Sequence, residues 1–331
     1  MISTQTQAAD QRSSGLCAGR VASILAPCLV CLFTSSCGAA DGGHDPGEDD
    51  ALPPDMGEGA LVESALPAPQ YLPKATGPCP DFTEGVLTFT PDGRPRKVQV
   101  WVGSAAKTLD GPLVLYWHGL GSTPMEAYAG LGYSTIQEIK NMGGIVAAPT
   151  PEAGAAPYPW YYTTTTAGKP DYDTRLADEI LACAVAKVGV DQRRIHSLGF
   201  SAGANQTMQL GYRRSGYIAS VVTYSGTKTG DAPVQDPQNL FPAAIFHGGP
   251  TDTYTAGSYV VKFQDASMAF AAELKSAGHF SFLCNHGLGH HLPPAAGASS
   301  AWRFLKDHPF GTSPSPYVAG LPAGFPSYCQ L

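Results

Sequence analysis

The chain has no apolar run of the length that a membrane-spanning helix needs, no excess of basic residues and no internal repeat. Its main apolar stretch, 21–33, covers 13 residues, whereas a helix needs about 20 to cross a bilayer. The net charge of −7 argues against the basic surface of a nucleic-acid-binding protein. The lack of a repeat argues against a propeller. The sequence is that of a globular domain preceded by a distinct N-terminal region.

The apolar stretch has the features of a secretory signal in residues 1–37. Basic residues precede it and small polar residues follow it. The small residues before Cys37 resemble a bacterial lipoprotein cleavage site, with Thr34 in place of the usual leucine. Cleavage after residues 38–40 is the alternative. Both cleavage sites indicate export. Cleavage before Cys37 would give a cell-surface lipoprotein attached to the membrane through a lipidated Cys37, and cleavage after 38–40 would give a secreted protein.

Residues 38–75 are rich in acidic residues, glycine and proline and show no apolar periodicity. Eight acidic residues against one lysine give this segment a net charge of −7. Such a composition predicts a disordered tether. The remaining residues, 76–331, are therefore nearly neutral, and they are numerous enough to bury the core of a single domain.

Four cysteines, Cys79, Cys183, Cys284 and Cys329, lie in residues 76–331. An even number in an exported domain indicates two disulfides. Three connectivities satisfy that number. We favour Cys284–Cys329 with Cys79–Cys183, because the C-terminal tail has to be tied to the domain.

Short apolar runs alternate with helix-compatible segments through the domain. Strands are predicted at 86–89, 97–102, 113–117, 144–148, 194–198, 218–222, 243–246 and 280–283, and helices at 173–188, 202–213, 259–277 and 299–307. The first two strands form a hairpin around Pro91-Asp92-Gly93. Alternation of this kind, with continuously apolar strands, predicts an α/β fold with a mostly parallel central sheet and helices on both faces.

The motif Gly199-x-Ser201-x-Gly203 lies between the strand at 194–198 and the helix at 202–213. A serine on a sharp strand-to-helix turn, flanked by glycines that avoid a clash, presents its hydroxyl to a ligand. Because the chain contains 38 glycines, the motif by itself could be a serine in a glycine-rich turn. Whether Ser201 is a nucleophile therefore depends on whether the chain also supplies catalytic partners for it. In parallel sheets they lie beyond the carboxyl ends of the strands.

A nucleophilic serine needs a histidine to take its proton and a carboxylate to orient that histidine. Asp252 follows the strand at 243–246 through a glycine-containing loop, which is the expected place for the carboxylate. The alternatives are Asp231 and Asp236, which lie in a proline-rich loop, and Asp265, which falls in a predicted helix.

Three histidines, His286, His290 and His291, follow the strand at 280–283. The glycines and prolines around them disfavour the helix that would align metal ligands, so we expect neither a metal nor a cofactor. His290 is favoured as the base, with His291 as the alternative.

The developing oxyanion also needs backbone donors. The N–H of Ala202 follows the nucleophile directly, and a second donor is expected from the loop after the strand at 113–117. In the run His118-Gly119-Leu120, Leu120 is the expected donor. The alternative is a simple turn that ends the strand.

This set of motifs resembles the α/β-hydrolase esterases, and within them the polyhydroxybutyrate depolymerase and feruloyl/acetylxylan esterase group. The resemblance rests, in chain order, on His118-Gly119, Asp191–Ile195, Gly199–Gly203, His247-Gly248 with Asp252, Gly289-His290 and Trp302–Leu305. The group often has Gly-x-Gly-His-x-Trp-Pro around its histidine, whereas Leu292 stands here in place of the tryptophan.

The resemblance implies an exported serine esterase, without a cofactor, acting on feruloyl, aryl or acetyl esters of plant polysaccharide. A polyhydroxyalkanoate or other polyester hydrolase is the alternative, as is a non-catalytic binding module on the same fold. A peptidase or a lipase is a further alternative among hydrolases, but the sequence shows neither a propeller domain nor a long apolar lid. His118, Trp160 and Tyr161 are expected substrate contacts, although the aromatic run 158–162 could instead pack its loop onto the domain. We expect a monomer that binds no nucleic acid.

Overall fold

The computed structural model describes residues 66–152, 155, 158–161, 171–228 and 232–331. The predicted signal, Cys37 and the predicted tether up to residue 65 lie outside these residues. No helix in the described part of the chain has the length and apolar character needed to span a bilayer.

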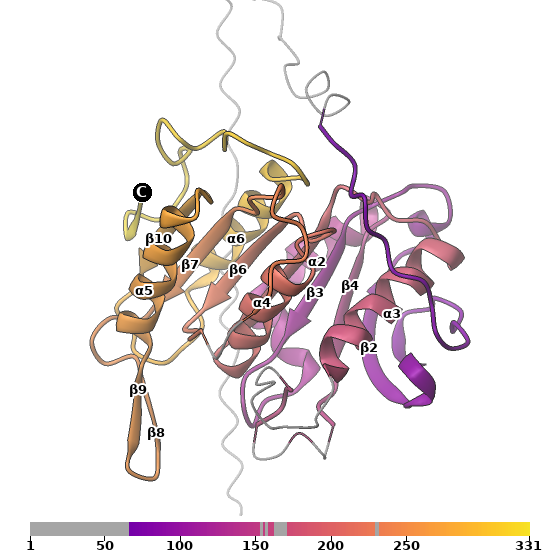
Figure 1. Ribbon diagram of the computed structural model, residues 1–331, viewed down its shortest axis with the longest axis horizontal. Coiled ribbons are helices and arrows are strands. Elements are labelled where there is room, and N and C mark those ends of the chain that lie inside the picture. The colour runs from indigo at the N-terminus through magenta and orange to yellow at the C-terminus, as the bar shows by residue number, and fades with distance from the viewer. Residues whose placement is uncertain (1–65, 153–154, 156–157, 162–170, 229–231) are drawn as a thin grey trace, which may run out of the picture. The chain divides into compact units, whose positions relative to one another are not determined.

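A nine-stranded sheet runs through the described residues, in the order β1-β2-β4-β3-β5-β6-β7-β10-β11 (Figure 1). The six strands from β4 to β10 in this order are parallel to one another, whereas β1, β2 and β11 pair antiparallel. The bounds are β1 (Gly85–Phe89), β2 (Arg96–Val102), β3 (Leu113–Trp117), β4 (Ile145–Pro149), β5 (Ile195–Phe200), β6 (Ser220–Tyr224), β7 (Ala243–His247), β10 (Ser281–Asn285) and β11 (Cys329–Gln330). The predicted mostly parallel sheet is confirmed.

Helices cover both faces of this sheet, because its central strands are apolar on both sides. Along β3, Leu113 and Leu115 face one core cluster, and Val114 and Tyr116 face the other. The helices of the first cluster are α3 (Tyr172–Lys187), α4 (Ala202–Arg213) and α5 (Phe263–Ser276). Those of the second are α1 (Ala127–Gly130), α2 (Tyr133–Asn141) and α6 (Ala295–Asp307). This arrangement leaves the carboxyl ends of the parallel strands as the edge where polar side chains gather.

Two predicted helices differ at their starts: α6 begins at Ala295 rather than at 299, and the helix predicted from 259 begins later. Residues 259–262 are a strand, β9 (Tyr259–Lys262), which pairs antiparallel with β8 (Thr253–Ala256), and α5 begins only at Phe263. The two strands are joined by Gly257-Ser258, with Gly257 at φ 61°. A glycine-serine turn between β-prone residues is itself a hairpin signal. The long helix-compatible sequence after it concealed the hairpin.

Both favoured disulfides are confirmed. Cys79–Cys183 joins the segment before β1 to α3, and Cys284–Cys329 joins β10 to β11. The second bond ties the C-terminal tail to the edge of the sheet. Closing loops of this kind typically stabilises a domain by about 2–4 kcal/mol each.

Candidate active site

Ser201 lies in the sharp turn between β5 and α4. Its backbone has φ 53° and ψ −116°, a region that a residue with a side chain rarely adopts. Two hydrogen bonds hold the turn, from Ser201 N to the Tyr224 carbonyl (2.8 Å) and from Asn205 N to the Ser201 carbonyl (3.1 Å). Strain of this kind persists only where the surroundings impose it, and it is concentrated at functional sites.

The two glycines that flank Ser201 are required by backbone packing. A Cβ atom on Gly199 would lie 2.4 Å from the Gly203 carbonyl oxygen. One on Gly203 would lie 1.8 Å from the carbonyl oxygen of Trp117, at the end of β3. The glycines therefore let α4 begin directly against the ends of two strands, which distinguishes this motif from an incidental glycine-rich turn.

Three predicted residues from the ends of different strands meet at this turn. Ser201 Oγ is 3.0 Å from His290 Nε2, and His290 Nδ1 is 2.8 Å from Asp252 Oδ1. Asp252 follows β7 and is 1% exposed, and His290 lies in the loop after β10. The contacts are those of a nucleophile, a base and the carboxylate that orients the base.

Asp252 is held as an ionised acceptor. Its Oδ2 accepts hydrogen bonds from Gly248 N and from the Ser225 hydroxyl, both at 2.7 Å. Burial raises the pKa of Asp252, but the hydrogen bonds from His290, Gly248 and Ser225 outweigh burial and lower it. Because an ionised carboxylate can only accept, His290 Nδ1 carries the proton, and Nε2 is left to accept one from Ser201.

The loops that carry Asp252 and His290 contact each other through their backbones. Gly289 N donates to the Gly248 carbonyl at 2.8 Å, and a Cβ atom on Gly248 would lie 1.8 Å from the Gly289 carbonyl oxygen. Gly289 also has φ 73°, in the left-handed region. These glycines fix the distance between the two loops and so the distance between Asp252 and His290.

Two phenylalanines that sequence reasoning missed hold the His290 ring. Phe263 stacks on it with centroids 4.3 Å apart and an interplanar angle of 11°, and Phe200 stacks at 4.9 Å and 29°. Phe263 N also donates to the Asp252 carbonyl at 2.9 Å. Phe200 occupies the variable position of the serine motif, whereas nothing in the sequence marks Phe263.

The alternatives to these residues lie elsewhere. His291 is exposed, and Asp236 caps its own loop by accepting from Gln238 N. Asp265 lies in the first turn of α5, and Asp231 falls outside the described residues. Within the described part of the chain, no group of three or more His, Cys, Asp or Glu side chains could hold a metal ion.

The two expected oxyanion donors, Leu120 and Ala202, line the same cavity as Ser201. The loop that carries Leu120 is anchored by Glu126, whose Oε1 accepts from Gly119 N at 3.1 Å and from the Tyr116 hydroxyl at 3.0 Å. Burial raises the pKa of Glu126, although the hydrogen bonds it accepts oppose that rise. Glu126 was not foreseen, because only the folded loop brings it beneath Gly119.

The structure corrects the three expected substrate contacts. His118 is fully buried, Trp160 is 2% exposed and Tyr161 is 8% exposed, and none of them is among the residues that line the cavity. Trp160 Nε1 donates to the His118 carbonyl at 2.9 Å, and Tyr161 N donates to the buried carboxylate of Asp173. These residues therefore pack their loop onto the domain, since a buried indole or amide N–H needs an internal acceptor.

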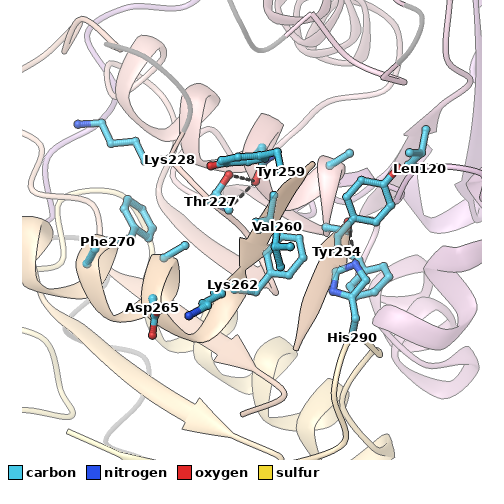
Figure 2. A pocket seen from close by; sticks show the side chains of 18 of the residues that line it. Leu120, Thr227, Lys228, Tyr254, Tyr259, Val260, Lys262, Asp265, Phe270 and His290 are labelled. Atoms are coloured by element: carbon cyan, nitrogen blue, oxygen red, sulfur yellow. Dashed lines mark hydrogen bonds between the residues drawn. The ribbon is translucent and has the colours of Figure 1, made fainter. Parts of the chain in front are cut away.

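The cavity at Ser201 has a volume of about 880 Å³ and is lined mainly by apolar and aromatic side chains (Figure 2). Phe200, Phe263 and Phe270 contribute from β5 and α5. Tyr158 is the one residue of the described part of the 158–162 run that reaches it. Cavities of this size hold ligands considerably larger than an acetyl group.

The sequence matches no protein-family model and no curated protein. The structure is similar to solved structures. Native sOPH has a TM-score of 0.60 at 17% identity, covering 76% of this chain and 96% of that one. Native pOPH has a TM-score of 0.61 at 16% identity, with the same coverage of 76% and 96%. A thermostable esterase has a TM-score of 0.52 at 17% identity, covering 68% of this chain and 62% of that one. At these identities the likeness shows the fold, and the expected α/β-hydrolase fold is confirmed.

Proposed function

We propose that this chain is a serine esterase that cleaves carboxylic esters through an acyl-enzyme. The observation that carries the proposal is the hydrogen-bonded series Ser201–His290–Asp252, which starts on a strained turn and opens into an apolar cavity. A binding module on the same fold would have no use for a buried carboxylate aligned with a histidine and a serine.

In the proposed reaction, Ser201 Oγ attacks the ester carbonyl carbon while His290 Nε2 takes the hydroxyl proton. Asp252 keeps His290 in the tautomer that can accept this proton and stabilises the imidazolium that forms. The amides of Ala202 and Leu120 donate to the oxyanion. His290 then gives its proton to the departing alcohol oxygen, and the acyl group stays on Ser201. Water then attacks the acyl carbon while His290 takes its proton. His290 returns that proton to the departing Ser201 Oγ, which frees the serine hydroxyl and releases the acid.

Among esters, we propose those with an aryl acyl group, such as feruloyl esters of plant polysaccharide. The aromatic side chains Tyr158, Tyr254 and Tyr259 on the cavity support an aryl group. Polyesters are the second candidate, because the cavity is far larger than one small acyl group requires. Export is supported by the two disulfides, which persist in oxidising compartments.

The test is hydrolysis of p-nitrophenyl acetate by the wild type and by Ser201→Ala, with labelling by a fluorophosphonate. We expect the variant to lose at least ~10³-fold in kcat and to fail to label. Ser300→Ala is the matched control, because Ser300 is a buried serine of α6 that bonds to the Ala296 carbonyl. A folded wild type that is neither labelled nor active on p-nitrophenyl acetate would refute the proposal. The rates of hydrolysis of methyl ferulate and of a polyester film would then show which substrate class the enzyme prefers.

A further inference from the structure

The β8–β9 hairpin, residues 253–262, is joined directly to the candidate active site at both ends. β8 begins with the residue after Asp252, and β9 ends with the residue before Phe263. The hydrogen bond from Phe263 N to the Asp252 carbonyl closes its base. Figure 1 shows the hairpin extending beyond the end of α5, away from the sheet. At ~3.3 Å per residue, its four-residue strands reach ~13 Å beyond the carboxylate.

One face of the hairpin is apolar. Tyr254 pairs with Val261, and Ala256 pairs with Tyr259. Because side chains alternate along a strand, Tyr254, Tyr259 and Val261 project from the same face, and Thr253, Thr255, Val260 and Lys262 project from the other. Tyr259 is 69% exposed, so burial within the domain does not explain the apolar face.

The apolar face belongs to the cavity that contains Ser201. Tyr254 and Tyr259 line it (Figure 2), and so does Val261. From the other face of the hairpin, Val260 and Lys262 also reach the cavity. On α5, Phe263, Ala266 and Phe270 line the same cavity at helical spacing. Scattered exposed apolar residues need no explanation, but aromatic and apolar side chains gathered along the cavity that contains Ser201 are typical of a ligand-binding groove.

We infer that the β8–β9 hairpin is a substrate-binding arm, and that its apolar face binds an extended apolar chain attached to the scissile ester. The inference rests on the proposed esterase function. Of the two substrate candidates, it favours a polyester or another ester with a long apolar chain over a feruloyl ester of polysaccharide. Tyr254 binds the part of the chain near the ester, and Tyr259 binds the part farther out.

The experiment measures selectivity, so that it does not depend on the absolute activity of a variant. Wild type and Tyr259→Ser are compared on p-nitrophenyl octanoate against acetate, which extends the acyl side. They are also compared on octyl against ethyl acetate, which extends the alcohol side. We expect the long-to-short ratio of kcat/KM to fall about 10-fold in one of the two series, and that series identifies the side that the arm binds. Tyr254→Ser should lower the same ratio.

Tyr133→Ser is the matched control, because Tyr133 is 65% exposed at the start of α2, on the opposite face of the sheet. Unchanged ratios in both series would overturn the inference. An equal loss on long and short esters would also overturn it, since the hairpin would then serve only to hold Phe263 against His290. A wild-type dimer that Tyr259→Ser converts to a monomer would show a self-association surface instead. Failure of the wild type on p-nitrophenyl acetate would refute the esterase function itself.

Discussion

Asp252→Asn is the substitution that tests the proposed active site most directly. The carboxylate has a different partner on each oxygen, His290 Nδ1 on Oδ1 and Gly248 N with the Ser225 hydroxyl on Oδ2. An asparagine can offer an acceptor on one side only. The Gly248 N–H cannot rotate away, and burying it unpaired costs about 1–3 kcal/mol. The asparagine oxygen therefore turns to Gly248, and its NH₂ faces His290.

That orientation changes the tautomer of the base. His290 Nδ1 has to accept from the asparagine NH₂, so the ring proton moves to Nε2, which faces Ser201 at 3.0 Å. A protonated Nε2 cannot take the serine proton. Loss of the correct tautomer lowers kcat by roughly 10⁴-fold, which corresponds to about 5 kcal/mol of transition-state stabilisation. Because the side chain keeps its shape, we expect KM to change less than about 3-fold.

The assay is steady-state hydrolysis of p-nitrophenyl acetate at neutral pH, with circular dichroism to verify folding. Asp236→Asn is the control, since Asp236 is a loop aspartate whose carboxylate accepts from Gln238 N. A folded Asp252→Asn that retains more than about a tenth of the wild-type kcat would refute the reasoning, as would an equal loss in Asp236→Asn.

Three further predictions follow from the contacts of single residues. Gly203→Ala should destabilise the domain by about 3 kcal/mol in urea unfolding, because its Cβ would lie 1.8 Å from the Trp117 carbonyl oxygen. Glu126→Ala should lower kcat about 10²-fold with little change in KM, because Gly119 N loses its acceptor and the Leu120 loop loses its anchor. The control Glu138→Ala, in α2, should leave kcat unchanged. Burial lowers the pKa of His308 to about 4, so the unfolded chain takes up the proton first. Acidification from pH 6.5 to 4 should therefore remove up to about 3 kcal/mol of stability through His308, and the loss of stability measured by urea unfolding should be smaller by about that amount in His308→Gln.

The central strands and the serine turn could be predicted because local chemistry determines them. The strand at 113–117 and the helix at 202–213 have the predicted bounds. A continuous apolar run defines the strand, and the sterically required Gly203 marks the start of the helix. The start of α5 could not be predicted in the same way. Tyr259 and Val260 are compatible with helix or strand, and the pairing with β8 decided between them.

The aromatic side chains show where sequence reasoning stops. Trp160 and Tyr259 are both large side chains in segments near the site, and composition does not separate them. Trp160 is buried because its indole N–H reaches the His118 carbonyl inside the domain. Tyr259 is 69% exposed on the β8–β9 hairpin. The sequence shows that an aromatic side chain prefers an apolar environment. Only the contacts in the folded protein show whether the rest of the domain or a ligand supplies that environment.

The sequence by itself determined the α/β alternation, the strand–turn–helix at Ser201 and the chain order of Ser201, Asp252 and His290, because these depend on residue periodicity and on the sterics of neighbouring residues. Only the tertiary structure decided that His290, rather than His291, meets Asp252 and that Phe263 stacks on the His290 ring. It also decided that the β8–β9 hairpin lines the cavity, to which Tyr158 alone contributes from the described residues 158–161. Those outcomes depend on contacts between residues far apart in the chain, and no local pattern contains them.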